Sequence, residues 1–450
     1  MIRILKNTLY TFFSKGHERT IRAKKNIAFS FFLKGISIVV GFVLIPMTIT
    51  YVNQSEYGVW LTLSSIISWL SFFDVGLGNG LKNKLAETNA LKQYDKSVAY
   101  VSTTYAVLVL IASGAFIIFF IGNNFIDWQK ILNAQSGDLT QLALIVFGFF
   151  CVQFVSQIIS TVLTAFHAPA KASLISVIGQ LLVLITIFVL TKTTKGSLIY
   201  LGYTLAGIPV IVQMISSFWL YNTEYKIVKP SFKAVNFKYV KDLLGIGGVF
   251  FILQIGALIL FQTDNIIITQ LFGPQKVTVF NVAYKLFAMV SMISGIILTP
   301  FWSAYTDAYA KDDFDWMRGS LKKTRNIWLI LSGGAFLLLI VSPLIYRIWL
   351  HDSVQVPVSV SIAMFLYVIG FNWMQVNCFF LNGIGKIRIQ LYLYLFSIVV
   401  NIPLAIFLAK FFNIAGVTLS NVVIFIIMGI ILHIQCNKIL NKSATGLWNK

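Results

Sequence analysis

The chain has 450 residues, of which 58% are hydrophobic and only 11% are charged, and its mean hydropathy is +0.82. Soluble domains carry roughly 25% charged residues, so this composition excludes a soluble globular protein and indicates an all-α polytopic membrane protein. The net charge of +20 comes without the interleaved basic and aromatic pattern of a nucleic-acid binder, so no nucleic-acid partner is expected.

The first 25 residues are basic, and they lack the apolar core and cleavage site of a secretory signal peptide. Ile2, Leu5, Leu9 and Phe12 recur at helical spacing among the basic residues. This pattern fits an interfacial amphipathic helix and fits a frayed basic tail equally well. Residues 1–25 are therefore predicted to be a cytoplasmic or interfacial segment.

Apolar segments of about 20 residues then recur along the whole chain, each long enough to cross a hydrocarbon core of about 30 Å. They predict about 12 transmembrane helices in two six-helix lobes, 26–221 and 243–436. A cytoplasmic linker at 222–242 joins the lobes, and a cytoplasmic tail at 437–450 ends the chain. The predicted spans cover residues 26–52, 57–80, 98–121, 140–166, 172–190, 198–221, 243–271, 277–300, 326–342, 358–382, 389–408 and 416–436.

Lysine and arginine predict the orientation of these spans. If the termini and alternate loops are cytoplasmic, those segments hold 27 of the 35 basic residues, whereas the opposite loops hold 6. Cytoplasmic loops carry the excess of Lys and Arg in membrane proteins. Both termini are therefore expected in the cytoplasm, which also accounts for most of the net positive charge.

The second half of the chain repeats the first at an offset of 220 residues. The segment "YVNQSEYGVWLTL" (51–63) aligns with "LFGPQKVTVFNVA" (271–283), and "YDKSVAYVSTTYAVLVLIASGAF" (94–116) aligns without a gap with "FDWMRGSLKKTRNIWLILSGGAF" (314–336). Because each half has six spans, the halves share one orientation. This predicts parallel repeats about a pseudo-two-fold axis along the membrane normal, with a substrate route between them.

Four ionisable side chains fall inside the predicted spans: Lys34, Asp74, Asp264 and Lys285. Each costs about 2.5–3.5 kcal/mol at mid-bilayer and so needs a partner or water. Lys34 and Asp74 lie about 10 Å from the inner boundary, and Asp264 and Lys285 lie about 10 Å from the outer one. We predict two gating ion pairs at these depths. The alternative is that the lysines reach the interface and the aspartates bond neighbouring helices.

Neutral polar residues on spans 7 and 8 form a second set of candidates. Gln254, Gln262, Asn265 and Asn281 could offer donors and acceptors to sugar hydroxyls, or they could hydrogen-bond between helices.

Sequence features of enzymes and metal sites are weak. Cys151, Cys378 and Cys436 are scattered without metal-ligand spacing and are expected to be packing residues. The motif "DFD" (313–315) offers two carboxylates, but its repeat partner "QYD" (93–95) offers one, which favours a solvated connector. No Walker loop, zinc signature or nucleophile elbow occurs, so neither an enzyme nor a metal centre is expected.

Residues around span 2 carry a resemblance to a known family. Pro46, "TYVNQSEYGVW" (50–60) and "FFDVGLGNGL" (72–81) resemble the polysaccharide transport, or O-antigen flippase, family of the multidrug/oligosaccharidyl-lipid/polysaccharide exporter superfamily. This resemblance implies a V-shaped MATE-like fold of two six-helix lobes, in which helices 1, 2, 7 and 8 line a central cavity and the lobes rock to give alternating access.

The resemblance also implies a function. Members are understood to flip undecaprenyl-pyrophosphate-linked oligosaccharide units of lipopolysaccharide O-antigen, capsule or exopolysaccharide across the bacterial cytoplasmic (inner) membrane. The implied partners are that substrate, membrane lipids, a polysaccharide polymerase and a chain-length regulator. The resemblance implies no cofactor other than an H⁺ or Na⁺ coupling ion. Two alternatives stay open: a cation-coupled multidrug exporter, although span 1 lacks an acidic residue, and a membrane polymerase or ligase, although the predicted outer loops are short.

Overall fold

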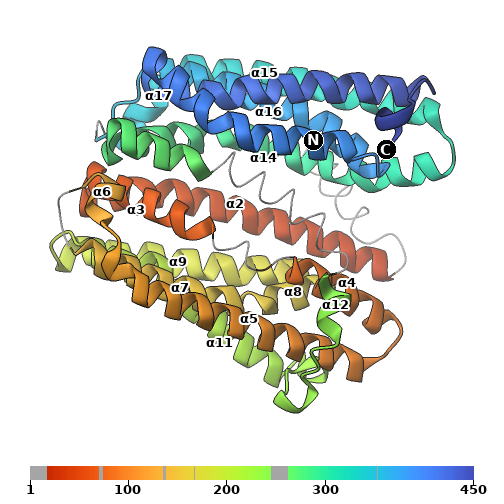
Figure 1. The fold of residues 1–450 in the computed structure, drawn as a ribbon, viewed down its shortest axis with the longest axis horizontal. Coiled ribbons are helices and arrows are strands. Elements are labelled where there is room, and N and C mark those ends of the chain that lie inside the picture. Colours follow the sequence, from red (N-terminus) through yellow and green to blue (C-terminus); the bar gives the residue numbers. More distant parts are fainter. Residues whose placement is uncertain are drawn as a thin grey trace, which may run out of the picture. The chain divides into compact units, whose positions relative to one another are not determined.

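In the part of the chain that it describes, the computed structural model consists of helices joined by turns and loops and contains no strands (Figure 1). This confirms the all-α prediction. The proposed amphipathic pattern at Ile2, Leu5, Leu9 and Phe12 lies outside the described residues. The structure describes residues 18–450 except 70–73, 75, 135–137, 167, 245–261 and 352.

The chain divides into two compact units. The first comprises 1–53, 70–128 and 136–251, and the second comprises 54–69, 129–135 and 252–450, each as far as it is described. The predicted lobe boundary falls between the halves of the sequence, whereas the structure assigns two short segments of the first half to the second unit.

In the first unit, the longest helices correspond to predicted spans 1 and 3–6. The helix of predicted span 1 packs along the helix of predicted span 5. Between them, Ser37 Oγ donates to Gln180 Oε1 at 2.6 Å, and the Tyr51 and Thr194 hydroxyls lie 3.0 Å apart. The described helices are α2 (Glu18–Val52), α4 (Leu77–Ala90), α5 (Tyr94–Gly122), α7 (Leu139–Ser156), α8 (Ile158–Ala165), α9 (Pro169–Thr193), α10 (Leu198–Gly202), the π-helix η3 (Tyr203–Gly207), α11 (Ile208–Asn222) and α12 (Tyr239–Leu244), together with the short 3₁₀-helices η2 (Asn123–Phe125), η4 (Lys226–Val228) and η5 (Phe232–Ala234).

The second unit contains α3 (Gln54–Ser68), helical residues 262–272, most of α6 (Trp128–Leu132), α14 (Pro274–Ala310), α15 (Phe314–Leu350), α16 (Val358–Gly383), α17 (Arg388–Leu440) and the 3₁₀-helix η6 (Gly446–Asn449). The long helix α17 is a hairpin, because Asn413 has φ 51° and ψ −138°. Asn401 Nδ2 donates to Asn421 Oδ1 at 2.8 Å across it, so α17 holds predicted spans 11 and 12.

Nine helices of the described part are long and apolar enough to cross a membrane, which confirms a multi-pass membrane protein. One of the nine is α17, which supplies two spans. Spans 2 and 7 are represented by α3 and by residues 262–272, which are too short to be counted among them. Cys151, Cys378 and Cys436 are buried and free, as expected of packing residues.

The prediction that span 2 is one helix over 57–80 is wrong. Helix α3 ends at Ser68, and α4 begins at Leu77 after Gly76, whose φ of 83° favours glycine because it lacks a Cβ. The Asp74 carboxylate accepts hydrogen bonds from the Gly78 N–H at 3.1 and 3.2 Å. This bond satisfies an orphan donor in the first turn of α4, as a helix cap does, and so favours a new helix start there.

The internal repeat is confirmed by backbone geometry. Asn53 and Gly273, which are 220 residues apart, have φ of 89° and 86°, and Lys92 and Asp312, also 220 apart, have φ of 57° and 54°. The helices α3 and α14 that follow the first pair, and α5 and α15 that follow the second, begin at equivalent positions. Conformations that are uncommon for L-residues therefore recur at the predicted offset.

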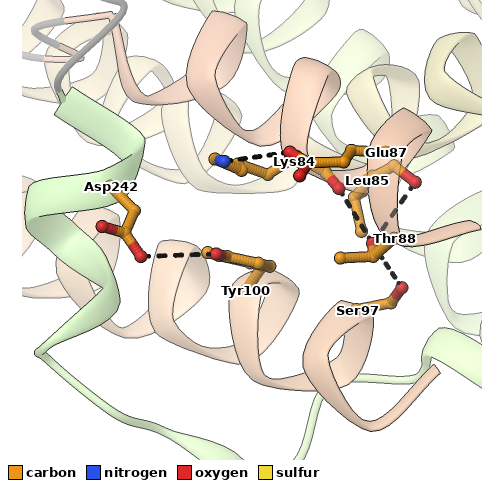
Figure 2. A network of polar contacts seen from close by, with 7 residues as sticks. All are labelled: Lys84, Leu85, Glu87, Thr88, Ser97, Tyr100 and Asp242. Carbon is orange, nitrogen blue, oxygen red and sulfur yellow. Dashed lines mark hydrogen bonds and ion pairs between the residues drawn. The ribbon is translucent and has the colours of Figure 1, made fainter. Parts of the chain in front are cut away.

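The linker that precedes the second lobe is packed on the first unit. A Cβ on Gly80 of α4 would lie 2.0 Å from the Leu243 carbonyl oxygen, so α12 approaches α4 at a distance that only glycine allows. The Tyr100 ring of α5 lies 4.7 Å from the Tyr239 ring. Figure 2 shows the Tyr100 hydroxyl directed at Asp242 of α12, with a 3.4 Å hydrogen bond.

The same close-up shows how α4 is held to α5 (Figure 2). The Thr88 and Ser97 hydroxyls lie 2.7 Å apart and are buried between the two helices. Within α4, Lys84 Nζ pairs with Glu87 Oε2 at 2.9 Å. The turn between α4 and α5 is thus fixed from within, and α12 is fixed against both helices.

Candidate functional site

Helices α3 and α14, which come from the two repeats, meet at their first turns within the second unit. A Cβ on Gly58 would lie 1.7 Å from the Pro274 carbonyl oxygen, so the two backbones are in direct contact. Thr278 is the repeat equivalent of Gly58, and its Oγ1 donates to the Gln54 carbonyl at 2.7 Å. Each helix therefore presents its fifth residue to the first carbonyl of the other, as in a self-complementary two-fold contact.

Side chains continue this contact along one face of α3. The Gln54 amide donates to the Gln275 carbonyl at 3.2 Å, and the Gln275 amide donates to Gln54 Oε1 at 3.3 Å. One turn further, the buried Thr62 and Thr269 hydroxyls lie 2.5 Å apart. The contact thus reaches from helices α3 and α14 to residues 262–272.

A chain of amide hydrogen bonds follows at the next turn. Asn265 Nδ2 donates to Ser65 Oγ at 2.7 Å, and Asn281 Nδ2 donates to Asn265 Oδ1 at 2.8 Å. Asn265 and Asn281, two of the candidates for sugar contact, make the interhelical hydrogen bonds of the alternative interpretation in this structure. We call this set the α3–α14 clasp, and its residues are Gln54, Gly58, Thr62, Ser65, Asn265, Thr269, Pro274, Gln275, Thr278 and Asn281.

Sequence reasoning missed most of the clasp, although a signal was present. Gln54, Gly58, Thr62 and Ser65 are small or polar and recur at spacings of four, four and three, which places them on one face of a helix. Small residues let membrane helices approach closely, and polar ones bond across the interface. Such a row of residues on one helix face predicts contact with another helix but does not identify the partner helix.

Asp264 lies in a second polar cluster of the same unit. Its side chain is 3% exposed, and Oδ2 accepts a hydrogen bond from Asn421 Nδ2 at 2.7 Å. Asn401 donates in turn to Asn421, as described for the α17 hairpin. Within the described residues, Asp264 Oδ1 has no hydrogen-bond partner. A buried carboxylate with half its acceptor capacity unused favours a bound proton or cation, because desolvation penalises the bare charge.

The structure does not bring the predicted ion pairs together. Lys34 is exposed on α2, while the Asp74 carboxylate accepts from the Gly78 N–H of α4. Lys285 is exposed on α14, while Asp264 bonds Asn421. Among the ion pairs that join described residues, none includes these four side chains.

The remaining candidates from the sequence are Gln262 and Gln254. Gln262 is partly exposed at the start of the described portion of span 7. Gln254 lies outside the described residues.

The fold resembles solved multidrug transporters. An inward-facing multidrug resistance MATE family transporter of the MOP superfamily superposes with a TM-score of 0.72 at 14% identity, covering 94% of this chain and 100% of that chain. An outward-facing multidrug resistance MATE family transporter of the MOP superfamily superposes with a TM-score of 0.63 at 15% identity, covering 94% of this chain and 96% of that chain. At such identities the likeness establishes the fold alone.

Sequence comparisons identify closer relatives. "Putative O-antigen transporter" of Salmonella typhi is 26% identical over 69% of this chain and 70% of its own length. "Putative O-antigen export protein" of Yersinia pseudotuberculosis is 21% identical over 78% and 81%. The MatE family model matches residues 251–407, and the model described as polysaccharide biosynthesis protein matches residues 23–304, more than half of the chain. The chain therefore belongs to the polysaccharide biosynthesis protein family.

Proposed function

We propose that this membrane protein is a flippase that moves lipid-linked oligosaccharide units across the bacterial cytoplasmic membrane, from the inner to the outer leaflet. The family, the relatives named as O-antigen transport and export proteins, and the transporter fold support this function. The proposed substrate is an undecaprenyl-pyrophosphate-linked repeat unit. A polysaccharide polymerase and a chain-length regulator are proposed to act on the flipped product.

The observation that carries a transport mechanism is the α3–α14 clasp. It joins the first turns of equivalent helices, and both turns follow loops with few basic residues, which the positive-inside rule assigns to the outer side of the membrane. We therefore assign the clasp as an outer gate, closed in this structure. Because its contacts are polar and reciprocal, it can break as a unit when the repeats separate.

Asp264 is the proposed coupling group. Its buried carboxylate has one unused oxygen beside an Asn421–Asn401 relay, so proton or sodium uptake would change the charge inside the second unit. A charge change at this place can alter how the 262–272 segment packs against α17. Lys34, Asp74 and Lys285 are retained as weaker candidates for substrate contact.

Deletion of the encoding gene tests the function. For a flippase, we expect surface polysaccharide to disappear and lipid-linked repeat units to accumulate on the cytoplasmic side. The MatE match and the MATE-like fold make a multidrug exporter the second candidate. That function predicts intact surface polysaccharide together with increased sensitivity to cationic compounds, and this result would overturn the flippase proposal.

A further inference from the structure

The second unit contains a small, partly open aromatic cavity whose lining residues belong neither to the clasp nor to the hydrogen-bonded Asp264 cluster. It measures about 230 Å³ and lies between α14 and α16. Tyr284, Ala288 and Ser291 face it from α14 at helical spacings of four and three, and Tyr367 and Phe371 face it from α16. The cavity is therefore large enough for a small ligand and not only for a single water molecule.

The aromatic walls are held in place by neighbouring rings. The Phe425 ring of α17 lies 5.2 Å from the Tyr367 ring and 5.4 Å from the Phe371 ring, both edge to face. Tyr284 lies edge to face with Tyr367 at 6.0 Å, yet it is still 37% exposed. The cavity thus combines two fixed rings with one that a ligand can reach.

The polar groups of the cavity indicate what it would bind. Ser291 Oγ is buried and has no hydrogen-bond partner within the described part of the chain. A dry acyl chain would leave this hydroxyl unsatisfied at a cost in free energy, whereas a ligand with its own hydroxyls would satisfy it. The required ligand is compact, with apolar faces for the rings and hydroxyls at its edge.

We propose that this cavity is a subsite for one sugar ring of the transported oligosaccharide. A pyranose has this combination of C–H faces and peripheral hydroxyls. Tyr284 lies about 15 Å along α14 from its first residue, near the middle of a bilayer core, where transporters place substrate sites. The proposal rests on the flippase function and adds to it the residues that contact the glycan.

The test uses the full chain in lipid nanodiscs and two classes of probe. One is undecaprenyl pyrophosphate, and the other is the same lipid carrying a single glucose, galactose or N-acetylglucosamine. We expect wild type to bind at least one glycosylated lipid more tightly than the bare lipid. Phe371→Leu should reduce this preference by roughly three- to tenfold, which is the contribution of an aromatic pair. Ala288→Phe should remove it by filling the cavity.

A matched control is available on the same helix. Phe365 of α16 contacts Phe336 of α15 and does not line the cavity, so Phe365→Leu should keep the preference for sugar. Equal loss in Phe365→Leu and Phe371→Leu, or an unchanged preference in Ala288→Phe, overturns the subsite. A wild-type protein that binds glycosylated and bare lipid equally also overturns it. Failure of wild type to bind either lipid contradicts the flippase function itself.

Discussion

Replacement of Gly58 by alanine should force the α3–α14 clasp apart. The added Cβ would lie 1.7 Å from the Pro274 carbonyl oxygen, whereas ordinary contacts of this kind begin at 3.4 Å, so the helices must separate by about 1.7 Å. The same separation would lengthen the 2.7 Å bond from Thr278 to the Gln54 carbonyl to about 4.4 Å, beyond hydrogen-bonding range.

The energetic effect follows from these contacts. Overpacking costs about 1–3 kcal/mol, and each lost hydrogen bond costs about 0.5–1.5 kcal/mol. With one hydrogen bond lost, the closed clasp should therefore lose about 1.5–4.5 kcal/mol relative to an open one, which shifts the equilibrium by roughly 10- to 2,000-fold. If the clasp is the outer gate, the variant should populate an outward-open state and transport poorly.

Distance measurements between spin labels can detect this shift. Ser55 and Lys276 are exposed on the first turns of α3 and α14, so nitroxides can be attached there after cysteine substitution, with the three buried native cysteines replaced by alanine. Gly58→Ala should broaden the distances and move them to larger values in nanodiscs. Gly295→Ala is the matched control, because a Cβ at this α14 glycine meets no atom within 4 Å.

The gate assignment would be refuted by either of two results. One is a Gly58→Ala protein with the label distances and flux of Gly295→Ala. The other is a protein whose labels separate while flux stays at the wild-type level, because opening of an outer gate must then be irrelevant to transport.

Three further predictions concern the other polar and close contacts. Asp264→Asn should lower flux at least tenfold and abolish its dependence on a proton or sodium gradient in vesicles, whereas unchanged ion dependence would exclude this group as the coupling site. Asp74→Ala should destabilise the start of α4 by about 0.5–2 kcal/mol in thermal unfolding and Asp74→Asn by less, since the asparagine side-chain oxygen can still accept from the Gly78 N–H; equal losses would argue against a role for this hydrogen bond. Gly80→Ala should lower thermal stability and expose α12 to proteolysis, because its Cβ would lie 2.0 Å from the Leu243 carbonyl, while Gly114→Ala, which meets no atom within 4 Å, should not.

Local sequence patterns were sufficient for several features. Long apolar runs predicted the spans, and the offset of 220 predicted the repeat that reappears as paired positive φ angles at Asn53 and Gly273. Both features depend on residues near one another in the chain or on the same pattern occurring twice. The prediction of span 2 was wrong because apolar composition does not mark the helix start at Leu77, which depends on the positive φ of Gly76 and on the hydrogen bond from the Gly78 N–H to Asp74.

The sequence by itself determined the class of protein, the approximate position of its helices and the duplication, because hydropathy and periodicity are properties of each segment alone. Only the tertiary structure decided the partners of the polar residues. It placed Asp264 beside Asn421, 157 residues later, and packed α3 against the equivalent helix of the other repeat. Depth along a span is readable from residue number, but rotation about the helix axis and the choice of neighbour are fixed only when the helices pack.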